Sequence, residues 1–323
     1  MKNLFLVDGS SFIFRAFYAL PPLTNPEGVP INAVYGYCNM ILNITEKFKP
    51  DQIIVVFDTK NKTFRNEIYK EYKSNRSEPP EELIPQFPII REANDALNLP
   101  QIELDGYEAD DIIATYTTQA EKKGISVTII SSDKDLMQLV NKKTKMYDSM
   151  KDNFIGIKEV KEKFGVDPSK LIDLQALAGD SVDNIPGVPG IGVKTASELL
   201  NNFGNLENLF SRLDEIKQSK RKDILSKEKD KAIVSKKLVT LVRNVPMNND
   251  YSFKTFKGIN QQTALKFFEK HGFKNLILRF QKDTKTDKGK IKENSDSGGK
   301  NYKVIQTVSD FDKMVKKIYK MLL

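Results

Sequence analysis

The sequence of 323 residues predicts an α/β fold, in which a central, mostly parallel sheet carries helices on both faces and is followed by a helical layer. Apolar runs of β-forming residues are continuous rather than alternating, as in parallel strands covered on both faces. These runs lie at 3–7, 52–57 and 125–130. Amphipathic helical patterns separate them, at about 33–48, 82–97 and 108–122. This alternation is typical of a doubly wound sheet.

Each predicted strand leads to an acidic residue. Asp8 follows the first run, Asp58 follows the second, and Asp133 follows the third after two serines. In open α/β sheets, binding sites form at the carboxyl ends of the strands. We therefore expect these three aspartates to meet at one edge of the sheet.

Six further acids stand close to these strands or in a later turn: Glu108, Asp110, Asp111, Asp135, Asp180 and Asp183. Helix-capping acids account for one or two of the three at 108–111, because the helix dipole favours them there, but not for all three. Nine acids can share a pocket only if cations neutralise them. Oxygen ligands select Mg²⁺ or Mn²⁺, and paired ions of this kind hydrolyse phosphodiesters.

The overall composition indicates a polyanionic partner. The chain has 51 basic and 43 acidic residues, which gives a net charge of +8. A basic surface around an acidic pocket suits a protein that holds a nucleic acid backbone and binds metal beside it. The alternative is a generally lysine-rich composition without a functional meaning.

Composition also excludes several kinds of site. With one histidine, His271, and one cysteine, Cys38, the chain cannot form an internal disulfide, a Cys/His zinc site or a second histidine-based nucleophile pair. We expect His271 to end a helix and Cys38 to lie in the core. An unpaired thiol suits a reducing cytoplasm, and we expect no signal peptide and no membrane span.

The segment 62–88 interleaves basic and aromatic residues. Among them are Arg65, Tyr69, Tyr72, Lys73 and Arg76. Positive charges for phosphates and rings for bases suit a grip on single-stranded nucleic acid. The alternative is a solvated helix that turns an aromatic pair toward the core.

A glycine-rich turn opens the helical layer: Gly187, Gly190, Gly192, Lys194 and Thr195. Glycines let backbone N–H groups approach a phosphate at a helix start. The segment is not a P-loop, because Lys194 does not directly follow a glycine. It fits a helix–hairpin–helix that follows one DNA strand without reading bases, and the alternative is a structural turn. Basic helices at 212–241 are expected to complete this layer.

Together these motifs resemble the 5′ nuclease domains of bacterial DNA polymerase I, in the flap endonuclease superfamily. The resemblance runs from about Phe5 to Phe280, through motifs at 5–10, 55–58, 64–76, 106–111, 133–139, 179–188 and 190–196. It implies a PIN-like α/β metal-nuclease core at 1–175 with a basic helical arch at about 62–88. A helix–hairpin–helix subdomain at 176–280, a flexible linker at 281–300 and, at 301–323, the truncated start of a 3′ exonuclease-like domain would follow.

The resemblance also implies the roles of the site residues. One Mg²⁺ ion would be held by Asp8, Asp58, Glu108 and Asp110, and a second by Asp133, Asp135, Asp180 and Asp183, with Asp111 between the sites. Mn²⁺ can substitute in such sites. Asp110 and Asp133 are expected to be essential for catalysis. Lys73 and Arg76 would contact the scissile phosphate, Arg65, Tyr69 and Tyr72 would contact DNA, and the glycine-rich hairpin would bind duplex with a K⁺ ion.

The implied function is that of a Mg²⁺-dependent 5′→3′ exonuclease and 5′-flap endonuclease. It would act as a monomer in the bacterial cytoplasm, at the nucleoid, on DNA with a flap, a nick or an RNA primer, during replication and excision repair. The polymerase domain of the family is absent from this chain. Two alternatives are a small metal-dependent RNase of the same broad α/β type and a catalytically silent DNA-junction binding factor.

Overall fold

A computed structural model describes residues 2–247 and 255–286. Contacts divide the chain into the units Met1–Phe280 and Gln281–Leu323. The last described helix, α13 (Lys274–Thr286), runs on past residue 280 into the segment expected to be a linker. The rest of that segment, and the strand and helix expected within 301–323, lie outside the described residues.

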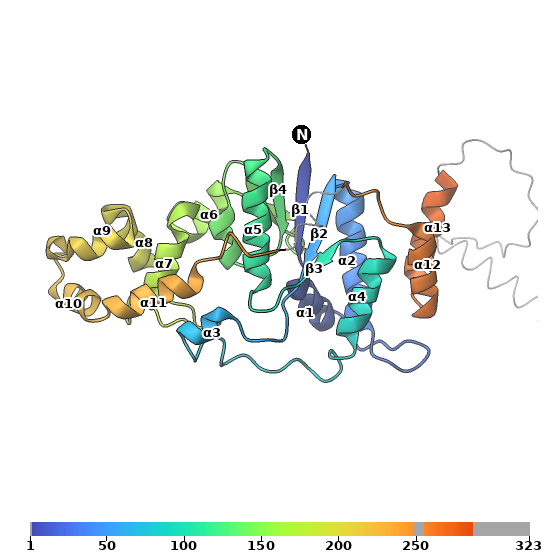
Figure 1. The fold of residues 1–323 in the computed structure, drawn as a ribbon, viewed down its shortest axis with the longest axis horizontal. Helices are drawn as coiled ribbons and strands as arrows, with labels where there is room; N and C mark the ends of the chain where they lie inside the picture. The colour runs from blue at the N-terminus through green and yellow to red at the C-terminus, as the bar shows by residue number, and fades with distance from the viewer. Residues whose placement is uncertain (1, 248–254, 287–323) are drawn as a thin grey trace, which may run out of the picture. The chain divides into compact units, whose positions relative to one another are not determined.

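A six-stranded sheet forms the centre of the first unit, with the order β3-β2-β1-β4-β5-β6. Figure 1 labels its strands β1 to β4. The first five strands are parallel to their neighbours, and the edge strand β6 is antiparallel to β5. Val7 of β1 lies opposite Val55 of β2 and Ile130 of β4. The strands are β1 (Asn3–Asp8), β2 (Gln52–Val56), β3 (Gln101–Ile102), β4 (Ser126–Ile130), β5 (Thr144–Asp148) and β6 (Asn153–Ile155).

The strands bury both faces, which explains their continuous apolar runs. Phe5 and Val7 pack into one apolar cluster, with helices α1 (Gly9–Ala19), α2 (Asn32–Phe48) and α4 (Gln86–Ala96). Leu4 and Leu6 point to the other face and pack with α5 (Ala109–Lys122). The predicted α/β architecture with helices on both faces is therefore confirmed. Helix α4 begins later than expected, because a turn ending at Pro85 precedes it.

A helical layer follows the sheet and joins the cluster that contains α5. Helix α11 packs against α7, and α7 against α8. The helices after β6 are α6 (Ile157–Phe164), α7 (Leu171–Ala178), α8 (Val193–Phe203), α9 (Leu206–Ser211), α10 (Ser219–Lys227), α11 (Lys229–Val239) and α12 (Gln261–Lys270). Among the described residues, short 3-10 turns lie between β4 and β5 (Asp135–Leu139), before α7 (Pro168–Lys170) and before α10 (Leu213–Glu215). None of the helices within the described ranges combines the length and apolar character needed to cross a bilayer.

The segment between β2 and α4 is mostly irregular. Its helix is confined to α3 (Phe64–Ile68), and turns occupy 70–75 and 81–85. Within the helical arch expected at 62–88, the helical residues are those of α3 and the first residues of α4, from Gln86 on.

Cys38 and His271 have the structural roles that were predicted for them. Cys38 is fully buried in α2, and His271 ends α12 beside Phe267 and Phe273. Burial lowers the pKa of His271, which keeps this imidazole neutral.

Candidate metal and nucleic acid site

Asp8, Asp58 and Asp133 lie together at the carboxyl edge of the sheet, as the strand pattern predicted, and Asp110 of α5 lies with them. Asp8 ends β1, accepts a hydrogen bond from the Ser11 N–H at 3.0 Å and caps α1. Its second oxygen accepts a hydrogen bond from Ser131 Oγ at 2.8 Å. Asp58 follows β2 and accepts from the N–H of Ala109 at 2.8 Å, which ties the β2 end to the start of α5. Asp110 and Asp133 complete this edge.

These acids act on one another electrostatically. Burial raises the pKa of Asp8 to about 7, and the charges of Asp58 and Asp133 add to the effect. Burial also raises the pKa of Asp110 well above its ordinary value, together with the charges of Asp133, Asp8 and Asp58. The pKa of Asp135 rises to about 7 through burial and the charge of Asp133. Ionisation of the whole cluster at neutral pH therefore requires cations.

Basic side chains neutralise part of the cluster. The Nζ of Lys73 lies 2.7 Å from Glu108 Oε1 and 3.6 Å from Asp183 Oδ2. Arg76 pairs with Asp183 at 2.5 Å, and Lys134 pairs with Asp180 at 2.7 Å. Burial by itself lowers the pKa of Lys73, but the charges of Glu108, Tyr72 and Asp183 outweigh it and raise that pKa.

The donor set fits divalent cations. Eight carboxylates (Asp8, Asp58, Glu108, Asp110, Asp133, Asp135, Asp180 and Asp183) gather here, with oxygen as their only ligand atom, and three of them have raised pKa values. Across residues 2–247 and 255–286, no three His, Cys, Asp or Glu side chains are already arranged around a common metal position.

Arg65 and Asp111 differ from their predicted roles. Arg65 is 1 % exposed and Asp111 is 0 % exposed. Two guanidinium nitrogens of Arg65 donate to the two oxygens of Asp111 at 2.7 Å each. The same carboxylate accepts from the backbone N–H groups of Val242 and Glu108. With its oxygens occupied in this way, Asp111 is not available to a metal, and Arg65 is not available to DNA.

The capping alternative for the 108–111 acids is correct in part. Glu108 and Asp111 form a reciprocal capping box at the start of α5. Asp110 takes no part in that box and belongs to the charged cluster. Of these three acids, Asp111 is structural and Asp110 belongs to the charged cluster. Glu108 does both, because it caps α5 and pairs with Lys73.

Tyr72 also differs from its predicted role. Its ring is buried, and its hydroxyl donates to Glu108 at 3.1 Å, so it cannot stack on a base. Tyr69 is half-buried, and its hydroxyl donates to Glu71. Lys73 has left-handed backbone with φ of 55°, and its N–H donates to the carbonyl of Asp183 at 3.0 Å. The backbone thus places Lys73 directly against the acid cluster.

The glycine-rich turn contains one structural glycine and two open ones. A Cβ on Gly187 would lie 2.4 Å from the backbone nitrogen of Gly179, and the N–H of Gly187 donates to Ser235 Oγ. Gly187 therefore serves chain packing rather than a phosphate contact. A Cβ on Gly190 or Gly192 would meet nothing within 4 Å, so their backbone is accessible. Lys194 and Thr195 follow in the first turn of α8.

Two residues at the site were missed by the sequence analysis. Lys134 pairs with Asp180, and its position between Asp133 and Asp135 is a signal that was overlooked. Gln175 donates to Asp135 from α7, and a lone glutamine in a helix gives no such signal.

The fold and this edge define an α/β domain with an acid cluster, joined to a helical domain. The chain belongs to the 5′-3′ exonuclease family. The model of its N-terminal resolvase-like domain matches residues 3–165, and that of its C-terminal SAM fold matches residues 166–258.

Relatives agree with this assignment. The chain is 53 % identical over 285 residues to DNA polymerase I of Rhizobium leguminosarum, covering 86 % of this chain but 28 % of that protein. It is 42 % identical over 228 residues to the 5′-3′ exonuclease of Aquifex aeolicus, covering 69 % of this chain and 79 % of that protein. The fold is similar to that of the bacteriophage T5 flap endonuclease, solved with DNA and metal ions, at a TM-score of 0.64 and 23 % identity over 88 % of this chain and 98 % of that one.

Proposed function

We propose that this chain is a Mg²⁺-dependent 5′→3′ exonuclease and 5′-flap endonuclease. Its substrates are phosphodiesters of DNA and of RNA primers that carry a flap or a nick, in replication and excision repair. The observation that carries the proposal is the group of acids at one sheet edge whose charges raise each other's pKa values. A family of 5′-3′ exonucleases supplies the reaction class.

We assign one ion to Asp8, Asp58, Glu108 and Asp110, and a second to Asp133, Asp135, Asp180 and Asp183. Asp111 is left out, because Arg65 and two backbone N–H groups occupy its oxygens. Bound Mg²⁺, or Mn²⁺ in its place, supplies the positive charge that activates water and stabilises the departing oxygen.

Lys73 and Arg76 hold the reacting phosphate. Both now pair with carboxylates of the cluster, so their cationic ends already lie at the place where the phosphate must bind. Donors aimed at the developing charge stabilise the transition state. Tyr69, which is only half-buried, lies beside them and offers a ring to an unpaired base.

The open turn at Gly190 and Gly192 holds the duplex backbone, together with Lys194 and Thr195. Its accessible backbone suits a phosphate contact through a K⁺ ion. We infer that the protein acts as a monomer in the bacterial cytoplasm, at the nucleoid. The chain spans 28 % of the length of the Rhizobium relative.

The test is cleavage of a 5′-flap duplex with and without Mg²⁺. Asp133→Asn is expected to abolish cleavage while the melting temperature stays within about a degree of the wild type or rises, because a like charge is removed. Asp105→Asn, in the exposed loop before α5, is the matched control and should cleave normally. Normal cleavage by Asp133→Asn would contradict the proposed metal site, and cleavage of RNA alone would favour the RNase alternative.

A further inference from the structure

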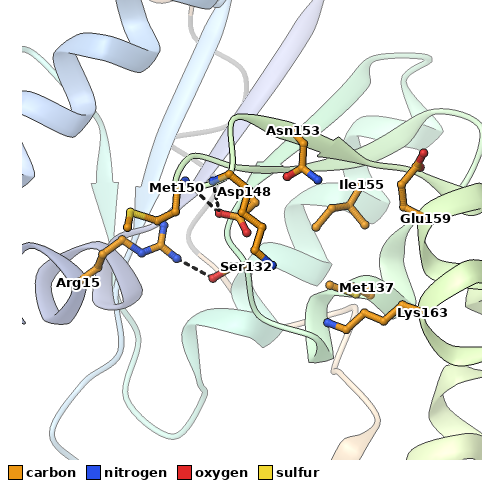
Figure 2. Close-up of a pocket in the computed structure, with 10 residues that line it drawn as sticks. Arg15, Ser132, Met137, Asp148, Met150, Asn153, Ile155, Glu159 and Lys163 are labelled. Carbon is orange, nitrogen blue, oxygen red and sulfur yellow. Dashed lines mark hydrogen bonds between the residues drawn. The ribbon is translucent and has the colours of Figure 1, made fainter. Parts of the chain in front are cut away.

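A cavity of about 490 Å³ lies beside Ser132 and Arg15 (Figure 2). Ser132, which lines it, directly precedes Asp133 of the cluster. The remaining lining comes from α1, from Met137 of the 3-10 turn Asp135–Leu139, from the β5–β6 hairpin and from α6. The cavity therefore adjoins the acid cluster through Ser132.

Three cationic side chains line this cavity without a carboxylate partner. Among the residues that the structure describes, Arg15, Lys151 and Lys163 take part in no ion pair. Arg15 donates instead to the hydroxyls of Ser132, at 2.6 Å, and Ser149, at 3.1 Å. Figure 2 shows Arg15 and Lys163 approaching the cavity from different sides.

Like charges surround Lys163. Burial lowers the pKa of Lys163, and the charges of Lys151 and Lys134 lower it further, although Asp133 and Asp148 act in the opposite direction. The charged form of Lys163 is thus destabilised both by burial and by the neighbouring cations. An anion in the cavity would remove this unfavourable interaction.

The two acids of the lining are already used by local backbone. Asp148 accepts from the Met150 N–H at 3.0 Å, and Glu159 accepts from the Gly156 N–H at 2.8 Å and caps α6. Both carboxylates thus stabilise their own turns, and within the described residues neither forms an ion pair with Lys151 or Lys163. Met137 and Ile155 supply an apolar wall of the same cavity, against which a sugar or base can pack.

We propose that this cavity is a phosphate subsite, which holds a phosphate of the substrate strand next to the scissile one. The proposal deepens the proposed function and rests on it for the identity of the ligand. Arg15 and Ser132 present donors in a fixed arrangement, and Lys151 and Lys163 add charge without geometric demands. Such a subsite sets the register of the strand relative to the acid cluster, since phosphate contacts position a nucleic acid without reading its sequence.

The experiment compares the double variant Lys151→Gln/Lys163→Gln with wild type and with Lys158→Gln. Lys158 lies on the same helix α6, is 79 % exposed and pairs with Glu162, so it is the matched control. Affinity for a 5′-flap duplex is measured in EDTA at several salt concentrations. A second series places a single neutral methylphosphonate at each position flanking the scissile bond. Cleavage in Mg²⁺ is measured separately.

We expect the double variant to lose roughly tenfold in affinity and to show a salt slope smaller by about one, as for one lost phosphate contact, with the control unchanged. One methylphosphonate position should weaken wild type and leave the double variant unaffected. Equal affinities for the double variant and Lys158→Gln, or methylphosphonate effects that are the same in both proteins, would overturn the subsite. Binding of inorganic phosphate alone, with no position-dependent effect on DNA, would also overturn it.

Failure of the proposed function has a different signature. Wild type that never cleaves the flap in Mg²⁺, but shows the position-dependent loss of binding, would refute the nuclease and support the phosphate subsite.

Discussion

Replacing Arg65 by Met tests whether this arginine is a buried strut or a DNA contact. Its guanidinium donates to both oxygens of Asp111 and to the backbone carbonyls of Leu238 and Thr240. The substitution leaves a buried carboxylate with backbone N–H donors alone and deprives two carbonyls of their donor. Removing one partner of a buried ion pair costs about 3–5 kcal/mol. For a folded unit of this size, that corresponds to a fall of about 5–9 °C in melting temperature.

The assay is thermal and urea unfolding of three variants. Arg65→Met should unfold early, whereas Arg76→Met should change the unfolding free energy by at most about 1 kcal/mol, because its guanidinium is about half exposed. The double variant Arg65→Met/Asp111→Leu should recover much of the loss, because no uncompensated charge remains buried. If Arg65→Met keeps its stability and loses DNA affinity instead, the strut is refuted and the original prediction for Arg65 is restored.

Three further predictions concern the site. Lys73→Ala should lower the single-turnover cleavage rate by roughly 10²–10³-fold. It should also raise the Mn²⁺ affinity measured by calorimetry, because the Lys73 ammonium no longer neutralises Glu108. Weaker Mn²⁺ binding would contradict this competition. Gly192→Val should weaken binding to flapped duplex and leave single-strand affinity unchanged, since its φ of −90° suits a side chain and its open surroundings place the effect on the backbone contact. Equal losses on both substrates would indicate misfolding. In the folded state the pKa values of Asp8 and Asp135 are raised to about 7, above the ordinary value of an aspartate. Between about pH 4 and pH 7 the folded protein therefore holds more protons than the unfolded chain, and the metal-free protein loses stability as the pH rises through this range. Melting curves should therefore show a larger Mg²⁺ stabilisation at pH 8 than at pH 5.5, and a stabilisation that is independent of pH would refute the assignment.

The sheet could be predicted where its strands are buried on both faces. Strands β1, β2 and β4 are continuous apolar runs, and each was placed within about two residues. Strand β3 has only two residues, and β5 contains Thr144 and Lys145 among apolar positions. Such short or mixed segments exist as strands because a neighbouring strand is already in place, and local sequence does not carry that information.

The acids of the cluster could be predicted for the same topological reason. Parallel strands end at one edge, so Asp8, Asp58 and Asp133 had to lie near one another. Arg65 and Tyr72 could not be assigned correctly from their spacing. A basic and aromatic segment has the same pattern whether it faces DNA or fills the interior, and the decisive partners of Arg65 at Leu238 and Thr240 are distant in sequence. Likewise, only the close approach of Gly179 distinguishes Gly187 from its open neighbours.

The pairing of Lys73 and Arg76 with the cluster connects metal binding to substrate binding. Glu108 and Asp183 now share their charge with these two side chains at 2.5–2.7 Å. Each carboxylate that takes a divalent ion has less charge left for an ammonium or guanidinium, and the like charges of ion and side chain repel. A side chain displaced in this way is a free cation beside a phosphate position. On the proposed function, metal binding to the acid cluster therefore releases Lys73 and Arg76 to bind the substrate phosphate, so that metal and DNA should bind with positive cooperativity.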